Sequence, residues 1–322
     1  MSVKRIGVLT SGGDAPGMNP CVRSVVRTAI HLGIEVYGIR RGWNGLINGD
    51  VTPLDVKSVS RIINRGGTVL YTARSKEFMT PEGQQKAANT CKFLGLDSVI
   101  AIGGDGTFRG AQALSKFGIN VIGIPATIDN DIGCTNYCLG FDTAANTAIE
   151  CIDKLRDTMQ SHDRCSVVEV MGRHAGFLAM YVGLAVGATA VLVPENPLSR
   201  TERVEKIRHA RLIGFTHYRI VVAEGAAPAN EVAQIIREEL CLDPRITVLG
   251  HIQRGGSPTA RDRVAATKMG YLAVELLKEG KTNRIVCTHD VGFTDVDMDE
   301  GLAAKKHMQT MEMDVLSAMT GL

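Results

Sequence analysis

Residues 5–19, RIGVLTSGGDAPGMN, decide how the fold of this chain is interpreted. The centre of the run RIGVLT has no polar side chain, which is typical of a strand buried on both faces. Three glycines follow within six residues, before a helical pattern that begins at about Asn19. Such glycines let the backbone approach a phosphate, and the amide N–H groups and the helix dipole then face that anion. The turn is either a phosphate-binding loop or a tight βα loop without a ligand, and it matches neither GxGxxG nor GxxxxGK[ST].

Six more apolar runs recur along the chain, and helical patterns separate them, the first over about Asn19–Leu32. Unbroken apolar strands that alternate with helices indicate an α/β fold with mostly parallel sheets covered on both faces. Because 322 residues exceed what one hydrophobic core usually serves, we expect two doubly wound, Rossmann-like domains with a boundary near Asp131–Gly140. After Phe293 we expect closing helices. The runs are VYGIR (36–40), SVIAIGG (98–104), VIGIP (121–125), SVVEVMG (166–172), AVLVPE (190–195) and RIVVAEG (219–225).

The composition excludes several classes of partner. With 36 basic and 34 acidic residues, no overall field attracts nucleic acid or anionic lipid, so we expect neither partner. The N-terminus shows no signal-peptide pattern, which predicts a cytoplasmic protein. The uncharged stretch Gly176–Val193 is broken near Gly187 and is interpreted as a buried helix and strand, not a membrane span. The eight cysteines form no CxxC, and Cys134 and Cys138 lack the partners of a zinc site.

A second glycine-rich turn, IGGDGT at residues 102–107, follows another apolar run. Its glycines allow close approach of a polyphosphate. Asp105 is a hard oxygen ligand placed where Mg²⁺ would bridge to that phosphate. Asp105 is also suited to capping the next helix, and the two roles are compatible.

The loop Pro125–Asp131, PATIDND, follows the run VIGI and carries two carboxylates, Asp129 and Asp131. In an extended loop the two point to opposite sides, so one of them would face a substrate hydroxyl and the other a cation or a backbone group. A general base must lie within hydrogen-bond reach of the proton that it accepts. Asp-Asn-Asp is also ordinary turn chemistry, and the loop alone does not decide between these interpretations.

Isolated arginines near later strands add a possible anion site. Single arginines are usually solvated, as Arg164, Arg173 and Arg245 could be. The segment HIQRGG at residues 251–256 is different, because a His and an Arg flanked by glycines beside a strand suit a phosphate monoester.

Together these motifs resemble the bacterial ATP-dependent 6-phosphofructokinase family. TSGGDAPGMN, INRGGT, IGGDGT, TIDND, GFDTA, VVEVMGR and VLGHIQRGGSP occur in the order and spacing of that family, over nearly the whole chain. The resemblance implies Mg²⁺-dependent transfer of a phosphoryl group from ATP to the 1-hydroxyl of fructose 6-phosphate, the committed step of glycolysis, by a homotetramer. A GGDGT loop alone would also fit NAD kinases and lipid kinases, which lack the other motifs.

The resemblance also implies roles for single residues. Asp129 is the proton acceptor, Thr127 meets the same hydroxyl, and Arg173 stabilises the transferring group. Residues 1–138 with about 251–300 form an ATP-binding domain, and residues 139–250 with about 301–322 form a fructose 6-phosphate-binding domain. ATP contacts are Gly13, Arg74, Gly104, Asp105, Gly106 and Thr107, with Asp105 on Mg²⁺; sugar-phosphate contacts are Met171, Gly172, Arg173, Glu224, His251 and Arg254, with Arg164 and Arg245 reaching in from a neighbouring subunit.

The sequence departs from the family pattern in two places. Pyrophosphate-dependent relatives carry Asp in place of Gly106 and Lys in place of Ala126, so the small residues here favour ATP, although RHAG at residues 173–176 is closer to the pyrophosphate branch. At the effector site Arg23, Arg27 and Arg156 match arginines that bind a diphosphate. Acidic or basic family residues are replaced there by Val56, Thr189, Ile213 and Phe215, which predicts weak or absent activation by ADP.

Two alternative functions remain open. One is a pyrophosphate-dependent phosphofructokinase. The other is a non-catalytic sensor of nucleotides or sugar phosphates that kept the fold; it is disfavoured because a sensor does not need Asp105, Asp129 and Arg173 together.

Overall fold

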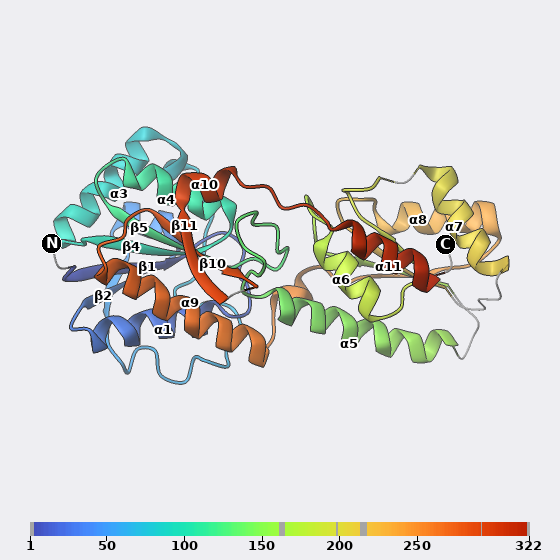
Figure 1. Cartoon of the computed structure of the whole chain (residues 1–322), viewed down its shortest axis with the longest axis horizontal. Helices are drawn as coiled ribbons and strands as arrows, with labels where there is room; N and C mark the ends of the chain where they lie inside the picture. The colour runs from blue at the N-terminus through green and yellow to red at the C-terminus, as the bar shows by residue number, and fades with distance from the viewer. Residues whose placement is uncertain (1–2, 161–164, 198, 213–217, 291, 321–322) are drawn as a thin grey trace. The chain divides into compact units, whose positions relative to one another are not determined.

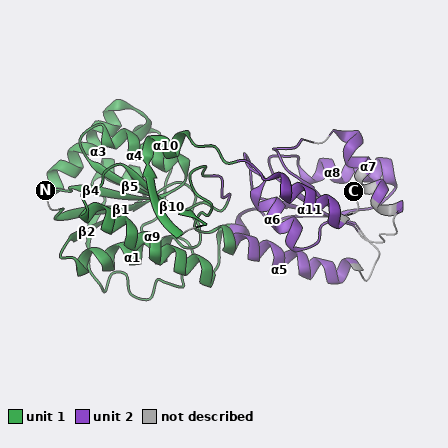
Figure 2. Cartoon of the chain, viewed as in Figure 1, with its two compact units in different colours: residues 1–128, 132–143, 254–306 green, residues 129–131, 144–253, 307–322 purple. Residues whose placement is uncertain are grey.

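The computed structural model describes residues 3–160, 165–197, 199–212, 218–290 and 292–320. The chain forms two compact units, each built from separated segments (Figure 2). Unit 1 comprises Met1–Ile128, Ile132–Thr143 and Arg254–Lys306. Unit 2 comprises Asp129–Asp131, Ala144–Gln253 and His307–Leu322.

Unit 1 is built on a seven-stranded sheet in the order β11-β10-β5-β4-β1-β2-β3. The five inner strands are parallel, and only the edge strands β3 and β11 pair in antiparallel fashion. Strand order reverses direction at β1, as in doubly wound folds. The strands are β1 (Arg5–Thr10), β2 (Glu35–Ile39), β3 (Val51–Leu54), β4 (Ser98–Gly103), β5 (Asn120–Pro125), β10 (Arg284–His289) and β11 (Gly292–Asp297).

Helices cover both faces of this sheet, with α1 and α9 along one face and α3, α4 and α10 along the other (Figure 1). The helices α1 and α9 pack closely: the Ser24 hydroxyl donates to the Thr267 carbonyl at 2.6 Å. A Cβ at Gly270 would lie 2.7 Å from the Ser24 Cβ, so only glycine fits there. The helices of unit 1 are α1 (Met18–His31), α2 (Gly42–Asn48), the 3-10 turn η1 (Glu77–Met79), α3 (Pro81–Leu94), α4 (Asp105–Ser115), α9 (Ala260–Lys278) and α10 (Met298–Ala303).

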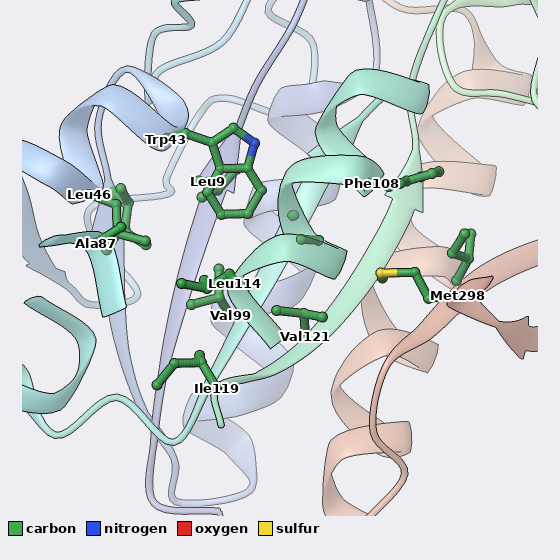
Figure 3. Packing of buried hydrophobic residues seen from close by; sticks show 14 of the residues in the cluster. Leu9, Trp43, Leu46, Ala87, Val99, Phe108, Leu114, Ile119, Val121 and Met298 are labelled. Atoms are coloured by element: carbon green, nitrogen blue, oxygen red, sulfur yellow. The ribbon is translucent and has the colours of Figure 1, made fainter. Parts of the chain in front are cut away.

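The core on the α3 and α4 side contains Trp43, which stacks on Phe78 with ring centroids 4.7 Å apart and planes 11° apart. Trp43 also lies against α4, since a Cβ at Gly110 would come within 2.5 Å of the indole Nε1. Figure 3 shows how side chains from α2, α3 and α4 pack on residues of β1, β4 and β5, including Leu9, Leu46, Ala87, Val99, Phe108, Leu114 and Val121.

Unit 2 contains a four-stranded sheet in the order β7-β8-β6-β9, in which every described pair is parallel. The prediction of an α/β fold with mostly parallel sheets is therefore confirmed. The strands of unit 2 are β6 (Cys165–Val170), β7 (Ala190–Leu192), β8 (Tyr218–Ala223) and β9 (Arg245–Val248). Its helices are α5 (Phe141–Gln160), α6 (Phe177–Ala185), α7 (Arg200–Leu212), α8 (Ala229–Leu240), the 3-10 turn η2 (Gly250–Arg254) and α11 (Thr310–Thr320). The first three residues of α5 and the last residue of η2 belong to unit 1.

The uncharged stretch noted in the sequence becomes helix α6 followed by the buried strand β7. Among the described residues, no helix combines the length and the apolar composition needed to cross a membrane.

Candidate active site

The first glycine-rich loop joins β1 to α1 in unit 1. Gly12 and Gly17 have φ of +87° and +110°, in the left-handed region that favours glycine. A Cβ at Gly13 would lie 2.5 Å from Nη1 of Arg254, and the same Nη1 donates to the Asp14 carbonyl at 3.1 Å. The structure thus places Arg254 against the backbone of this loop, which sequence reasoning did not predict.

The second loop lies beside the first, at the neighbouring end of β4. The Ser11 amide donates to the Ile102 carbonyl at 3.0 Å, and the buried Thr107 hydroxyl donates to the Ser11 carbonyl at 3.1 Å. Carboxyl ends of adjacent parallel strands at a reversal of strand order are the usual ligand site of such sheets. Two of the loops that the sequence identified are therefore joined directly.

Asp105 is the first residue of α4, and Gly104 occupies the N-cap position. The alternative interpretation of Asp105 as the helix cap is therefore wrong. Its half-exposed carboxylate accepts from Nε of Arg109 at 2.8 Å. At Gly106, no described atom outside its chain neighbours and its own helix backbone lies within 4 Å of where a Cβ would be. The helix start thus combines an accessible carboxylate with open space beside it.

The segment that carries Arg74 runs along the first loop, because the Thr72 hydroxyl donates to the Gly12 carbonyl at 2.6 Å. Arg74 itself is exposed. The loop after β5 is attached on the other side. There the Ala126 amide donates to the Gly103 carbonyl at 2.9 Å, and Gly104 lies beside the Thr127 side chain.

Thr127 and Asp129 are half-buried, and Asp131 is exposed. Between the two carboxylates stands Asn130, buried and with φ of +52°. Asn tolerates this left-handed conformation better than most residues, so the loop turns sharply at this point.

In unit 2, Arg173 and Glu224 follow the carboxyl ends of the paired strands β6 and β8. The Glu224 amide donates to the Val170 carbonyl at 2.9 Å, and Nε of Arg173 lies 3.7 Å from the Glu224 carboxylate. Gly172 has φ of +126°, and a Cβ at Gly225 would meet the Arg173 carbonyl oxygen at 1.9 Å. These glycines let the two strand ends approach each other.

Gln253 is a further residue of this region, and no role was predicted for it from the sequence. Its side chain is fully buried, and its Oε1 accepts from the Met171 amide at 2.9 Å. Only its place in the motif HIQRGG could have drawn attention to it, because the contact joins residues 82 positions apart.

His251 is exposed in η2. Arg245 begins β9, at the amino end of the unit 2 sheet, and its Nη2 lies 3.5 Å from the Asp243 carboxylate. Arg164 lies outside the described residues, as do Ile213 and Phe215.

The residues that match positions of the family's effector site belong to both units. Arg23 and Arg27 of α1 line a hollow of about 490 Å³ together with Lys268, Tyr271 and Phe293. In unit 2, Thr189 is buried and its hydroxyl accepts from the Arg219 amide at 3.1 Å. Burial and the nearby charge of Arg156 lower the pKa of Arg219.

Known proteins resemble this chain over nearly its whole length. It is 49% identical over 318 residues to an ATP-dependent 6-phosphofructokinase of Clostridium botulinum (strain Hall), covering 99% of this chain and 100% of that protein. It is 50% identical over 317 residues to the ATP-dependent 6-phosphofructokinase 1 of Clostridium perfringens, covering 98% of this chain and 99% of that one.

Solved structures agree with this relationship. Phosphofructokinase from Saccharomyces cerevisiae superposes with a TM-score of 0.87 at 32% identity over 98% of this chain, which spans 48% of the yeast chain, about half its length. A pyrophosphate-dependent phosphofructokinase from Marinobacter aquaeolei shares the fold, with a TM-score of 0.85 at 22% identity, covering 99% of this chain and 92% of that one. Residues 5–277 match the family described as phosphofructokinase, and the chain belongs to that family.

Proposed function

We propose that this chain is an ATP-dependent 6-phosphofructokinase, which transfers a phosphoryl group from ATP to the 1-hydroxyl of D-fructose 6-phosphate. The names and near-complete coverage of the clostridial relatives support this. The structural observation that carries it is the joined pair of glycine-rich loops at β1 and β4, tied by Thr107 and Ser11 and opening on Asp105 at the start of α4. The products are ADP and fructose 1,6-bisphosphate, as in the committed step of glycolysis.

In unit 1 we assign ATP binding to the two loops. The glycines admit the phosphates close to the backbone, and the amides at the start of α4 face them. The residues are Gly13, Arg74, Gly104, Asp105, Gly106 and Thr107.

Mg²⁺ fits this loop with Asp105 as its protein ligand. Among the described residues no group of three or more His, Cys, Asp or Glu could hold a metal ion alone. Mg²⁺ is commonly bound through one or two carboxylates together with substrate phosphates and water, so a single accessible carboxylate beside a phosphate loop suits it. When bound, the ion neutralises charge on the phosphates.

The chemical step is assigned to three side chains. Asp129 accepts the proton of the 1-hydroxyl, Thr127 orients that hydroxyl, and Arg173 stabilises negative charge on the transferring group. Sugar-phosphate binding is assigned to Met171, Gly172, Glu224, His251 and Arg254. The proximity of Arg173 and Glu224 and the exposure of His251 are compatible with these roles.

We further propose a homotetramer in which Arg164 and Arg245 contact the sugar phosphate of a neighbouring subunit. Arg245 stands at the amino end of β9, away from the carboxyl ends that carry Arg173 and Glu224. A role in its own subunit's sugar site would therefore be harder to reconcile with its position. Sedimentation of the native enzyme tests the assembly, and the cytoplasmic location expected from the N-terminus stays a prediction.

The decisive experiment is a coupled assay with fructose 6-phosphate in which ATP, GTP and pyrophosphate are supplied in turn. Open space at Gly106 and the buried Ala126 favour ATP, because an α-phosphate needs that space. We expect the highest turnover with ATP and little with pyrophosphate. Preference for pyrophosphate would support the alternative enzyme, and absence of turnover with every donor would support a sensor.

A further inference from the structure

Asp262 of α9 is fully buried, and its two carboxylate oxygens accept four hydrogen bonds from one turn of the chain. One oxygen accepts from the Tyr137 hydroxyl and from the Gly140 amide at 2.8 Å. The other accepts from the Thr143 amide at 3.0 Å and from the Thr143 hydroxyl. A buried carboxylate is tolerated only with such compensation, so Asp262 and the turn 137–143 depend on each other.

Local helix chemistry does not account for this arrangement. Asp262 is the third residue of α9, where an acidic side chain usually reaches back to the amide of the N-cap residue. Here the N-cap is Thr259, and its amide donates instead to the Thr143 hydroxyl at 3.0 Å. The Thr259 hydroxyl donates to Asp142 at 2.6 Å. The start of α9 is therefore built to hold the turn that begins α5.

That turn is in direct contact with two loops of the candidate active site. The Leu139 amide donates to the Pro125 carbonyl at 3.0 Å, beside a bridge between Ala126 and Leu139. Gly140 has φ of +99°, and a Cβ there would lie 2.7 Å from the Ala15 Cβ. The turn thus lies between the first glycine-rich loop and the backbone that leads to Thr127 and, two residues later, Asp129.

We propose that Asp262 is a positioning residue for phosphoryl transfer: it fixes the turn 137–143, and the turn fixes the backbone at Pro125–Ala126 from which Thr127 and Asp129 extend. The inference rests on the proposed function of this chain. A displacement of a catalytic group by about 1 Å can cost roughly 10²-fold in rate, so a residue that never touches substrate can still control kcat.

Asp262→Asn tests this with little change in volume. An amide retains one acceptor, but in either orientation its NH₂ group faces a backbone N–H, that of Gly140 or that of Thr143, so donor meets donor and the turn must shift. We expect kcat to fall by about 10- to 100-fold, while KM for ATP and for fructose 6-phosphate changes by less than about 3-fold. Rates are divided by the folded fraction and measured well below the Tm of each variant.

The matched control is Ser24→Ala, which removes the hydrogen bond to the Thr267 carbonyl on the same helix but touches no part of the turn. It should lower Tm and leave kcat unchanged. A second variant, Tyr137→Phe, removes one of the four donors and should lower kcat by about 3- to 10-fold. Because Tyr137→Phe acts on the same contact as Asp262→Asn, the double variant should be at most about 2-fold slower than Asp262→Asn alone.

Lower Tm with unchanged kcat in Asp262→Asn would show a purely structural role and overturn the proposal, while the activity of the native enzyme would still stand. If Asp262→Asn does not fold, Tyr137→Phe decides in the same way: a kcat equal to that of the native enzyme overturns the proposal. Absence of turnover by the native enzyme with every donor would overturn both the proposed function and the role of Asp262.

Discussion

Nε of Arg109 donates to the Asp105 carboxylate across one turn of α4, at 2.8 Å. Both side chains are at least half exposed, so the pair is worth only about 0.3–0.5 kcal/mol. Yet Arg109 occupies the carboxylate that we assign to Mg²⁺, so the ion must compete with the guanidinium for Asp105. Arg109 is therefore expected to weaken Mg²⁺ activation slightly.

Arg109→Met removes this competition. The half-saturating Mg²⁺ concentration should fall by about 2-fold, with kcat at saturating Mg²⁺ little changed. Initial rates over a Mg²⁺ titration at fixed ATP measure it. Lys154→Met, which breaks an ion pair of the same i,i+4 spacing with Glu150 on α5, is the control and should leave the midpoint unchanged. A higher midpoint in Arg109→Met would show that Arg109 assists the ion or the nucleotide.

Asp129→Ser removes the assigned base. We expect kcat to fall by roughly 10²–10⁴-fold with a modest change in KM, because the hydroxyl loses its proton acceptor while the substrate keeps its other contacts. Steady-state kinetics with fructose 6-phosphate and ATP measure both constants. Asp314→Ser makes the same change at an exposed carboxylate of α11 and should leave kcat unchanged. Equal activity of the two variants would contradict the assignment.

Gly106→Asp should raise KM for ATP by roughly 10- to 100-fold, since the new carboxylate would stand close to a phosphate. Tm should stay the same or rise. The site has room for a Cβ, and an acidic residue in the first helical turn is favoured by about 0.3–1 kcal/mol. Gly106→Ala fills the same space without charge and should keep nearly normal use of ATP. A normal KM for ATP in Gly106→Asp would remove this glycine from the explanation of donor choice.

Asp295→Asn tests a pH dependence of stability. Burial raises the pKa of Asp295, but donors from Lys281 and Arg284 outweigh it and hold the pKa below 3.8. A lowered pKa stabilises the fold above pH 3.8, and the stabilisation is lost as pH falls through the folded-state pKa.

Thermal melting should therefore show a lower Tm for Asp295→Asn at neutral pH and a shrinking difference below pH 3.8. Asp314→Asn alters an exposed carboxylate of α11 and should change Tm little at any pH. A Tm difference for Asp295→Asn that stays constant with pH would contradict the ion-pair explanation.

ADP should activate this enzyme weakly or not at all. The hydroxyl of Thr189, which replaces a metal-binding Glu of the family's effector site, is already bound to the Arg219 amide, and the residue is buried. Saturation curves for fructose 6-phosphate, with and without ADP at constant excess Mg²⁺, should have the same shape. If ADP turns a sigmoidal curve hyperbolic, Arg156→Ala shows whether it acts through this region.

The sequence predicted the parallel strands and the glycine-rich turns because both are local signals. Apolar runs such as RIGVLT define buried strands. The glycines that follow this run, Gly12 and Gly17, lie where the backbone is left-handed. The edge strand β11, GFTDVD, was not predicted and overlaps the expected closing helices, because half-exposed edge strands lack a continuous apolar run.

Contacts between distant segments could not be predicted. Arg254 meets the Asp14 carbonyl 240 residues away, and Asp262 meets Tyr137 across 125 residues. A single arginine or aspartate leaves no periodic pattern in the sequence. Its partner can be identified only in the folded structure, where the sheet brings the loops together. The catalytic roles assigned to Asp129 and Arg173, and the domain roles of the two units, stay predictions.

The stacking of Trp43 on Phe78 has a practical consequence. The chain contains one tryptophan, so its indole emission arises from a single place in the molecule. That place adjoins Gly110 on α4, the helix whose first residue is Asp105. The protein thus carries its own optical reporter against the helix that follows the loop assigned to nucleotide, and a titration that follows this emission needs no label and no coupled reaction.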